Sequence, residues 1–292
     1  MPTTYAHWRF GDKCISTLPK ELQEIINDNR DVFNFGVHGP DIFFYYKCIK
    51  HNNINQFGSD LHNTPFKDTL AKIKPIYNRM ADQKGALSYL LGFCCHFTLD
   101  SYCHGYIDRK VEVSQNSDKP TSHGIIETQY DKYLMIKDGY NPYRLKVTKT
   151  LKPSKRIGNI VGQLFPEIGD EIAYKSLMDH KFYLDLLKDK DPVKRRLLEK
   201  IMDHYNVSTF KDLLLTNKEF PEIEDSKMRL DKYFNKALEH YKELATNLVD
   251  YLKNNKPLID YFHNHFVPKE DYKNIPILSV EEEREYIVEK QF

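Results

Sequence analysis

Side chains that bind metals and transfer protons gather in one apolar stretch of the chain. His96, Asp100 and His104 follow one another at intervals of four residues within the segment LSYLLGFCCHFTLDSYCHGYI. On a helix each such interval advances by about 40°, so the three side chains share one stripe. His123 and Glu127 repeat the interval on a second segment. Burying such groups is costly unless they are paired or bind a cation, so the pattern predicts a metal site between neighbouring helices.

Taken one at a time, the polar residues of this region also have ordinary structural interpretations. His96 and His123 could be hydrogen-bonded histidines of an apolar core. Asp41 could be an acid at a helix N-terminus, where negative charge is favoured. Asp108 and Asp131 extend the two stripes by one turn; they could orient ligating histidines, but solvated surface acids are the favoured interpretation. It is the clustering of the candidate ligands that favours a metal site.

The candidate ligands belong to an ordered series of short motifs: His7, GPD (39–41), LHN (61–63), CHFTLDSYCHGYI (95–107) and SHGIIE (122–127). As a set, the series resembles the zinc-dependent phospholipase C family. That family shares its all-helical fold with the fungal single-strand-specific zinc nucleases. The resemblance is clear from residue 1 to about residue 135 and extends to the C-terminal half only as further helices.

The resemblance implies a ligand set for two or three zinc ions. Two carboxylates and two imidazoles would hold the first ion: Asp41, His62, His96 and Asp100. Three side chains would hold the second: His104, His123 and Glu127. His7 and Asp100 would contribute to a third ion, with Asp100 bridging two ions. His51 is a rival to His62 because it lies in the same polar loop.

Two features depart from the secreted members of that family. In those members the mature N-terminal Trp completes the third zinc site, whereas this chain begins with Met1 and has no recognisable signal peptide. Trp8 does not replace that group, because an indole N–H only donates hydrogen bonds. Choline-specific members also place aromatic side chains near the aspartate. Here the nearest aromatic residues are those of the run FFYY (43–46), where cation–π recognition is a possibility left open.

Composition excludes several classes of protein. The 292 residues carry a net charge of +1, so no overall basic field attracts nucleic acid, and no stable nucleic-acid partner is expected. The five cysteines lack a framework spacing and are interpreted as reduced core thiols of a cytoplasmic protein. No apolar run reaches about 18 residues, so no membrane span is expected. The oligomeric state stays open.

Periodicity predicts an all-α chain. Residues 1–12 are interpreted as a polar, aromatic lead-in, residues 140–170 as irregular and residues 111–114 as a weak strand. Pro75 is expected to kink or break its helix. Helices are predicted at 18–29, from Pro40, at 66–81, from 87, at 123–139, 171–188, 192–205, 208–216, 226–255 and 257–266. The predicted architecture is a zinc-dependent phospholipase C/nuclease-like helical fold with additional C-terminal helices. Residues 1–150 form its metal-binding helical core. Residues 151–292 form a C-terminal helical region packed on that core as one compact unit.

The function that these predictions favour is metal-dependent hydrolysis of a phosphodiester, phospholipase C-like, with a zinc-activated water as nucleophile. Asp41 is the predicted catalytic residue, a ligand that could also steer the water or accept its proton. The expected substrate is a phosphodiester or phospholipid. Two alternatives stay open: a zinc nuclease on the same scaffold, and a non-catalytic helical protein that binds zinc.

Overall fold

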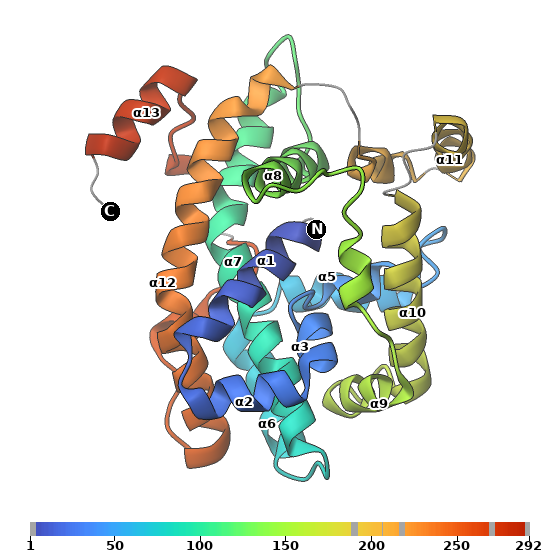
Figure 1. Cartoon of the computed structure of the whole chain (residues 1–292), viewed down its shortest axis with the longest axis vertical. Coiled ribbons are helices and arrows are strands. Elements are labelled where there is room, and N and C mark those ends of the chain that lie inside the picture. Colours follow the sequence, from blue (N-terminus) through green and yellow to red (C-terminus); the bar gives the residue numbers. More distant parts are fainter. Residues whose placement is uncertain (1–3, 188–191, 206, 216–219, 269–271, 290–292) are drawn as a thin grey trace.

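The structure is a computed structural model that describes residues 4–187, 192–205, 207–215, 220–268 and 272–289 (Figure 1). Within these ranges the chain forms thirteen α-helices and no strand, as the all-α prediction required. The α-helices are α1 Thr4–Thr17, α2 Lys20–Asp28, α3 Arg30–Gly36, α4 Asp41–Phe44, α5 Asn53–His62, α6 Phe66–Tyr77, α7 Gln83–Ser114, α8 His123–Lys137, α9 Lys155–Leu164, α10 Asp170–Leu187, α11 Pro192–His204, α12 Glu224–Asn254 and α13 Val280–Glu289. Five short 3-10 helices connect them: η1 Val147–Thr150, η2 Ser208–Leu213, η3 Pro221–Ile223, η4 Asp260–His263 and η5 Tyr272–Asn274.

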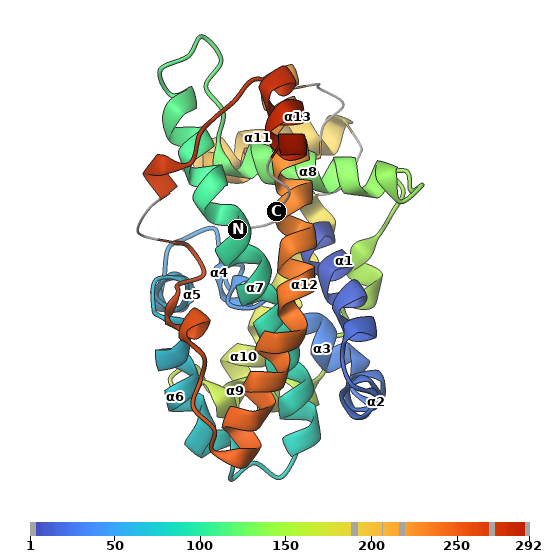
Figure 2. The same cartoon turned by 90° about the vertical axis from the view of Figure 1, so that its left-hand side faces the viewer.

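Helix α7 is the central element. Its 32 residues begin after Asp82, whose side chain accepts a hydrogen bond from the backbone N–H of Gly85 at 3.0 Å. An acceptor at this position satisfies one of the free N–H groups of the first turn. Residues 85–100 of α7 are buried on all sides, and α1, α3 and α12 cover them. Figure 2 shows α12 running alongside α7 for much of its length. The apolar surroundings explain why polar side chains on α7 are buried.

Glycines allow α3 to pack directly against the backbone of α7. A Cβ atom at Gly36 would lie 2.3 Å from the carbonyl oxygen of Tyr89, and one at Gly92 would lie 2.6 Å from that of Phe33. The turn after α3 needs a third glycine, because Gly39 has a φ of +49°. A Cβ atom there would also lie 2.4 Å from the ring of His96. These contacts bring the GPD motif onto the ligand stripe of α7.

The N-terminal segment corrects one prediction. Residues 4–17 form helix α1 instead of a polar lead-in, and Tyr5, Phe10 and Cys14 are buried. Asp131 of α8 accepts hydrogen bonds from the backbone N–H groups of Tyr5 and Ala6 at 2.8 and 2.7 Å. A carboxylate at this position satisfies free N–H groups and is favoured by the helix dipole. The prediction of Asp131 as a surface acid is therefore wrong: this buried residue fixes the start of α1.

Three local predictions around α7, α9 and α6 also need correction. Residues 111–114 are the last turn of α7, not a strand. The segment 140–170 is not wholly irregular, because it contains η1 and the ten-residue helix α9. Pro75 lies in the last turn of α6, which ends at Tyr77, so the helix stops close to the proline and does not extend to 81.

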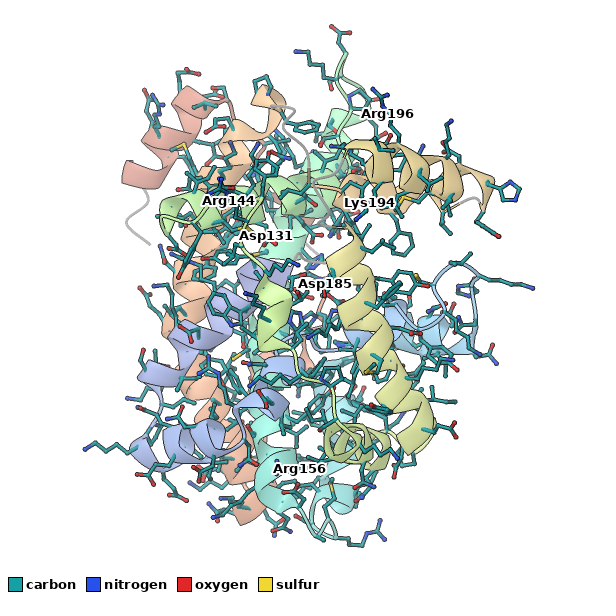
Figure 3. The ribbon with its side chains drawn as sticks, turned by 45° about the vertical axis from the view of Figure 1, so that its right-hand side comes forward. Asp131, Arg144, Arg156, Asp185, Lys194 and Arg196 are labelled. Carbon is teal, nitrogen blue, oxygen red and sulfur yellow. The ribbon has the colours of Figure 1, made fainter. Side chains whose placement is uncertain are left out.

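Helix α9 is connected to the start of α7 by Arg156, which is labelled in Figure 3. Its Nε donates a hydrogen bond to Oδ2 of Asp82 at 2.8 Å.

Long helices dominate the C-terminal half. The predicted apolar face of α12 is buried against α7, α1 and α8. Helix α13 is held on α12 by a buried bidentate ion pair between Arg229 and Glu283, at 2.9 and 2.6 Å. The predicted helix 208–216 is the 3-10 helix η2, and the segment 257–266 contains only the short η4. The division of the chain into a core of residues 1–150 and a C-terminal region of residues 151–292 stays a prediction. Among the described residues, the helices lack an apolar stretch of membrane-spanning length.

Candidate metal centre

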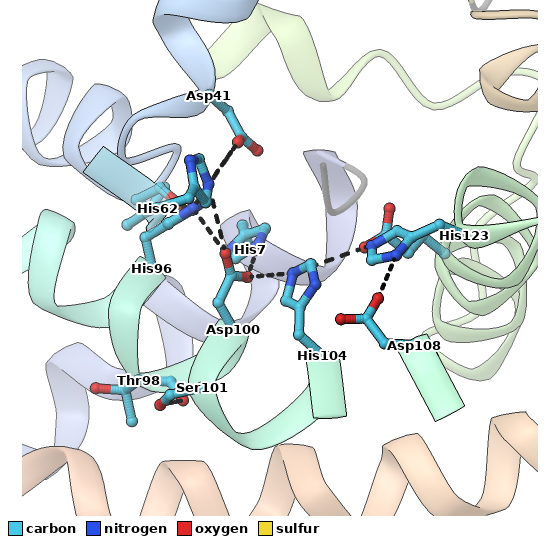
Figure 4. Close-up of polar contacts among 12 residues, drawn as sticks. His7, Asp41, His62, His96, Thr98, Asp100, Ser101, His104, Asp108 and His123 are labelled. Carbon is cyan, nitrogen blue, oxygen red and sulfur yellow. Dashed lines mark hydrogen bonds and ion pairs between the residues drawn. The ribbon is translucent and has the colours of Figure 1, made fainter. Parts of the chain in front are cut away.

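The Asp100 carboxylate lies at the centre of the histidine cluster (Figure 4). One carboxylate oxygen, Oδ1, is 3.2 Å from Nε2 of His7 and 3.4 Å from Nε2 of His104. The other, Oδ2, is 3.0 Å from Nε2 of His96. Helix α7 supplies Asp100, His96 and His104 from one stripe, while α1 brings in His7, whose ring stacks on that of His96 with centroids 4.2 Å apart. A carboxylate with this surrounding has the position of a ligand shared between cations.

One side of the cluster joins α4, α5 and α7. Nε2 of His62 is 3.2 Å from Oδ1 of Asp41, and Nε2 of His96 is 4.0 Å from the same oxygen. One ligand atom from each of these three residues lies within 4.8 Å of the other two. His62 also approaches Oδ2 of Asp100 at 3.9 Å, so Asp100 closes the group. In contrast, the rival His51 is exposed and belongs to none of the groups with metal-ligand spacing in the described chain.

The other side of the cluster joins the C-terminal part of α7 to the start of α8. Nε2 of His123 is 2.8 Å from Oε1 of Glu127, and Nε2 of His104 is 3.9 Å from the same oxygen. Asp108 also belongs here, because its Oδ1 is 3.1 Å from Nδ1 of His123 and the side chain is 30 % exposed. The prediction that favoured Asp108 as a solvated surface acid is therefore wrong, and the alternative of a carboxylate orienting His123 fits its position.

Hydrogen bonds fix the ring orientation of three histidines. Nδ1 of His62 is 2.8 Å from the carbonyl oxygen of Gly58, and Nδ1 of His96 is 3.3 Å from that of Val37. A carbonyl oxygen only accepts, so each Nδ1 carries the proton. Each Nε2 is then left as the basic nitrogen that faces the cluster. Asp108 likewise accepts a hydrogen bond from Nδ1 of His123 and so orients that ring. This arrangement is typical of histidines that bind a metal through Nε2.

The side chains of the cluster are buried without enough hydrogen bonds. His7, Asp41, His96, Asp100 and His104 are at most 3 % exposed. Several of their polar atoms make no aligned hydrogen bond to a described residue: both ring nitrogens of His7 and of His104, Nε2 of His96, Oδ1 of Asp41 and Oδ2 of Asp100. Such groups are costly to bury unless a cation satisfies them. Imidazole nitrogens mixed with carboxylate oxygens are the ligands that zinc prefers, so the residues fit zinc.

Electrostatics keep the carboxylates of the metal-free protein ionised. Burial alone would raise the pKa of Asp41, but the charges of His96 and of His62, whose Nε2 lies 3.2 Å from Oδ1, lower that pKa to about 2. For Asp100, burial again opposes ionisation, and His96 and His104 hold its pKa well below the usual range. Both residues are therefore available as anionic ligands at neutral pH.

The acids around His123 favour the protonated form of its ring. Burial lowers the pKa of His123, but the charge of Glu127 and the hydrogen bonds to Asp108 and Glu127 raise it to about 9. The ring is therefore protonated at neutral pH in the metal-free protein. A cation that binds its Nε2 must displace a proton, so affinity at this position rises with pH.

Comparison with known proteins gives one match. The model of a family described as zinc-dependent phospholipase C matches residues 6–168. This chain belongs to the zinc-dependent phospholipase C family. No curated protein and no solved structure matches it. The matched part of this family member contains every predicted ligand, from His7 to Glu127, and ends before α10. Helices α10–α13 thus lie outside the part that the family model describes.

A pocket of about 410 Å³ opens onto the candidate metal ligands of this family member. His62, His104, His123 and Glu127 line it beside apolar residues from distant segments: Phe44, Phe210, Leu213 and Val267. The last three of these come from the C-terminal half and do not follow from the ligand motifs. No motif marks them, and only the folded chain places them at the site.

Proposed function

We propose that the chain is a metal-dependent phosphodiesterase of the phospholipase C type that holds two or three zinc ions. Family membership supports the reaction class. The single observation that carries the proposal is Asp100, a buried carboxylate within 3.4 Å of three imidazole nitrogens. A purely structural role would leave these buried atoms without compensation, whereas cations would satisfy them.

The proposed ligands fall into groups around Asp100. The first ion takes Asp41, His62, His96 and Asp100. The second takes His104, His123 and Glu127, with Asp108 orienting His123. A third position, at His7 and Asp100, has fewer side-chain ligands and is therefore the weakest. Short distances between His62 and Asp41, between His96 and Asp100 and between His123 and Glu127 support the first two groupings. On the second side, the residues that meet at metal-ligand spacing are His104, Asp108 and His123.

The residues of the chain divide the work of hydrolysis. Zinc bound here would activate water as a nucleophile and neutralise charge on the phosphoryl oxygens. Asp41 is ionised at neutral pH and lies at the edge of the cluster, so we assign it to steer the water and accept its proton. Apolar side chains such as Phe44 and Phe210 lower the polarity of the pocket wall beside the ligands, which strengthens electrostatic interactions there.

Two assays run side by side test the substrate class. We expect zinc-loaded protein to hydrolyse short-chain phosphatidylcholine at least about tenfold faster than single-stranded DNA, measured as kcat/KM, because the net charge of +1 gives no basic field for a polyanion. The opposite order would assign the protein as a zinc nuclease. Bound zinc without turnover on either substrate would refute the enzymatic proposal and favour the non-catalytic alternative.

A further inference from the structure

Helix α11 exposes an apolar stripe. Val193, Leu197, Ile201 and Tyr205 follow at intervals of four residues and are 75, 58, 39 and 53 % exposed. Each interval advances by about 40°, so the four side chains form one band along the helix. The opposite face packs on the protein through Met202, which is 8 % exposed. A surface helix normally turns its apolar stripe inward, so an outward stripe indicates a binding surface.

Positive charge borders the stripe. Arg196 and Lys200, four residues apart, lie along one edge of the stripe, and Lys194 lies on its other edge. All three are exposed, and Figure 3 labels Lys194 and Arg196 where α11 projects from the body of the protein. The acidic residues of α11 are neutralised by partners. Glu199 pairs with Arg195 at 3.0 Å, and Asp203 pairs with Lys211 at 2.5 Å. The exposed face is thus apolar and cationic, the combination with which interfacial helices bind anionic lipid surfaces.

The helix is also continuous with the wall of the pocket. Helix α11 leads into η2, and the ion pair between Lys211 and Asp203 holds the two together. Within η2, Phe210 and Leu213 line the pocket beside the candidate zinc ligands. A partner bound to the stripe of α11 would therefore lie next to η2, which forms part of the pocket wall.

The connection extends to the ligand helix. The Asp212 carboxylate of η2 accepts a hydrogen bond at 2.6 Å from Ser122, the residue that caps α8. The backbone oxygen of Asp212 accepts another from Thr128 at 3.0 Å. Helix α8 carries His123 and Glu127. The contacts of η2 with both α11 and α8 therefore connect α11 to the candidate metal centre.

We propose that α11 lies in the headgroup region of an anionic phospholipid surface, with Leu197 and Ile201 inserted among the lipids and Arg196 and Lys200 on the phosphates. Docking of α11 would place the pocket next to the lipid surface, so that a phospholipid could enter it. This second step rests on the proposed phospholipase function, whereas binding of α11 to the surface does not. A second copy of the chain fits this face less well. In a two-fold contact between stripes, the bordering cations of both copies would meet and repel.

Vesicle binding of the full-length chain tests the apolar half of the proposal. The probe is a vesicle of phosphatidylcholine with about 30 % phosphatidylserine, which gives an anionic surface. We expect the variant L197E/I201E to reduce co-sedimentation at least about tenfold and vesicle hydrolysis with it, because charged side chains do not enter the acyl boundary. Hydrolysis of a soluble short-chain substrate stays within about twofold. The matched control is I136E on α8, which alters an aliphatic residue that is 57 % exposed elsewhere and retains binding.

The charged half has its own arm. R196E/K200E is expected to abolish the preference for anionic over pure phosphatidylcholine vesicles, while K20E, on the exposed start of α2, retains it. The proposal is overturned if the wild-type chain binds neither vesicle, or if L197E/I201E binds as the wild type does. It is also overturned if sedimentation velocity shows a dimer that only this variant dissociates, which would assign the stripe to a second copy. Vesicle binding without turnover on any phosphodiester would refute the proposed function and leave the docking intact.

Discussion

Replacement of Asp100 by asparagine is expected to remove at least one zinc equivalent and to lower kcat/KM by about 10³-fold or more. The two side chains have nearly the same shape, but the amide carries no charge and offers only one oxygen. His7, His96 and His104 all lie within 3.4 Å of the present carboxylate. Loss of residues that merely orient ligands costs about 10–100-fold, so loss of a shared ligand must cost more.

A matched buried aspartate controls for damage to the fold. Asp225 is 4 % exposed and pairs with Lys110 at 2.7 Å, outside the groups of candidate ligands. The variant D225N should lower the melting temperature while the zinc content stays that of the wild type. Zinc content and kcat/KM are measured on both variants. Equal zinc content in D100N and wild type would contradict the assignment of Asp100 as the shared ligand.

Removal of metal is expected to abolish hydrolysis and to lower the melting temperature by about 10 °C or more. A ligand at about 1,000 times its Kd stabilises a folded chain by about 4 kcal/mol per site, and a chain of this size responds by a few degrees per kcal/mol. Without a cation the buried ring nitrogens of His7 and His104 lack aligned hydrogen-bond partners, which lowers the stability of the folded chain. Thermal unfolding before and after chelation, at fixed pH, measures the effect.

Rescue after chelation distinguishes zinc from a general ionic effect. Zn²⁺ should restore both activity and melting temperature, whereas Mg²⁺ at the same concentration should restore neither. The reason is that Mg²⁺ disfavours imidazole ligands, which make up much of this cluster. An unchanged melting temperature after complete removal of zinc would mean that ion pairs alone hold the cluster together.

The sequence predicted the ligand stripes because a single rule governs them. Within α7 and α8 the spacing of four residues determines which side chains share a face, and the apolar surroundings determine that the face is buried. His96, Asp100 and His104 therefore lie where the pattern placed them. Their role as zinc ligands stays a prediction that the geometry supports.

Local pattern failed where distant segments decide the structure. Residues 4–17 look polar in isolation, yet Asp131 of α8 satisfies the first N–H groups of α1 from more than 120 residues away. The glycines of α9 suggest an irregular segment. In the structure, Gly158 lets α9 pack against α10, because a Cβ atom there would lie only 2.9 Å from the Cα of Tyr174. Such close approach between helices requires glycine, but the sequence alone does not identify the partner.

The pocket beside the candidate ligands could not be predicted from the sequence for the same reason. Phe210 and Leu213 face the site only because η2 packs on α8 through Asp212. The exposed stripe of α11 reads as an ordinary buried face by periodicity alone, because a helical pattern does not say which side meets the protein. Exposure of Leu197 and Ile201 in the folded chain is what turns that face into a candidate lipid surface.

The most direct test of the shared metal centre is the zinc content of wild-type protein purified without added zinc, measured as equivalents per chain by elemental mass spectrometry. Ligand groups on both sides of Asp100 predict two or three equivalents. One equivalent, or none, would contradict a centre in which Asp100 is shared between ions.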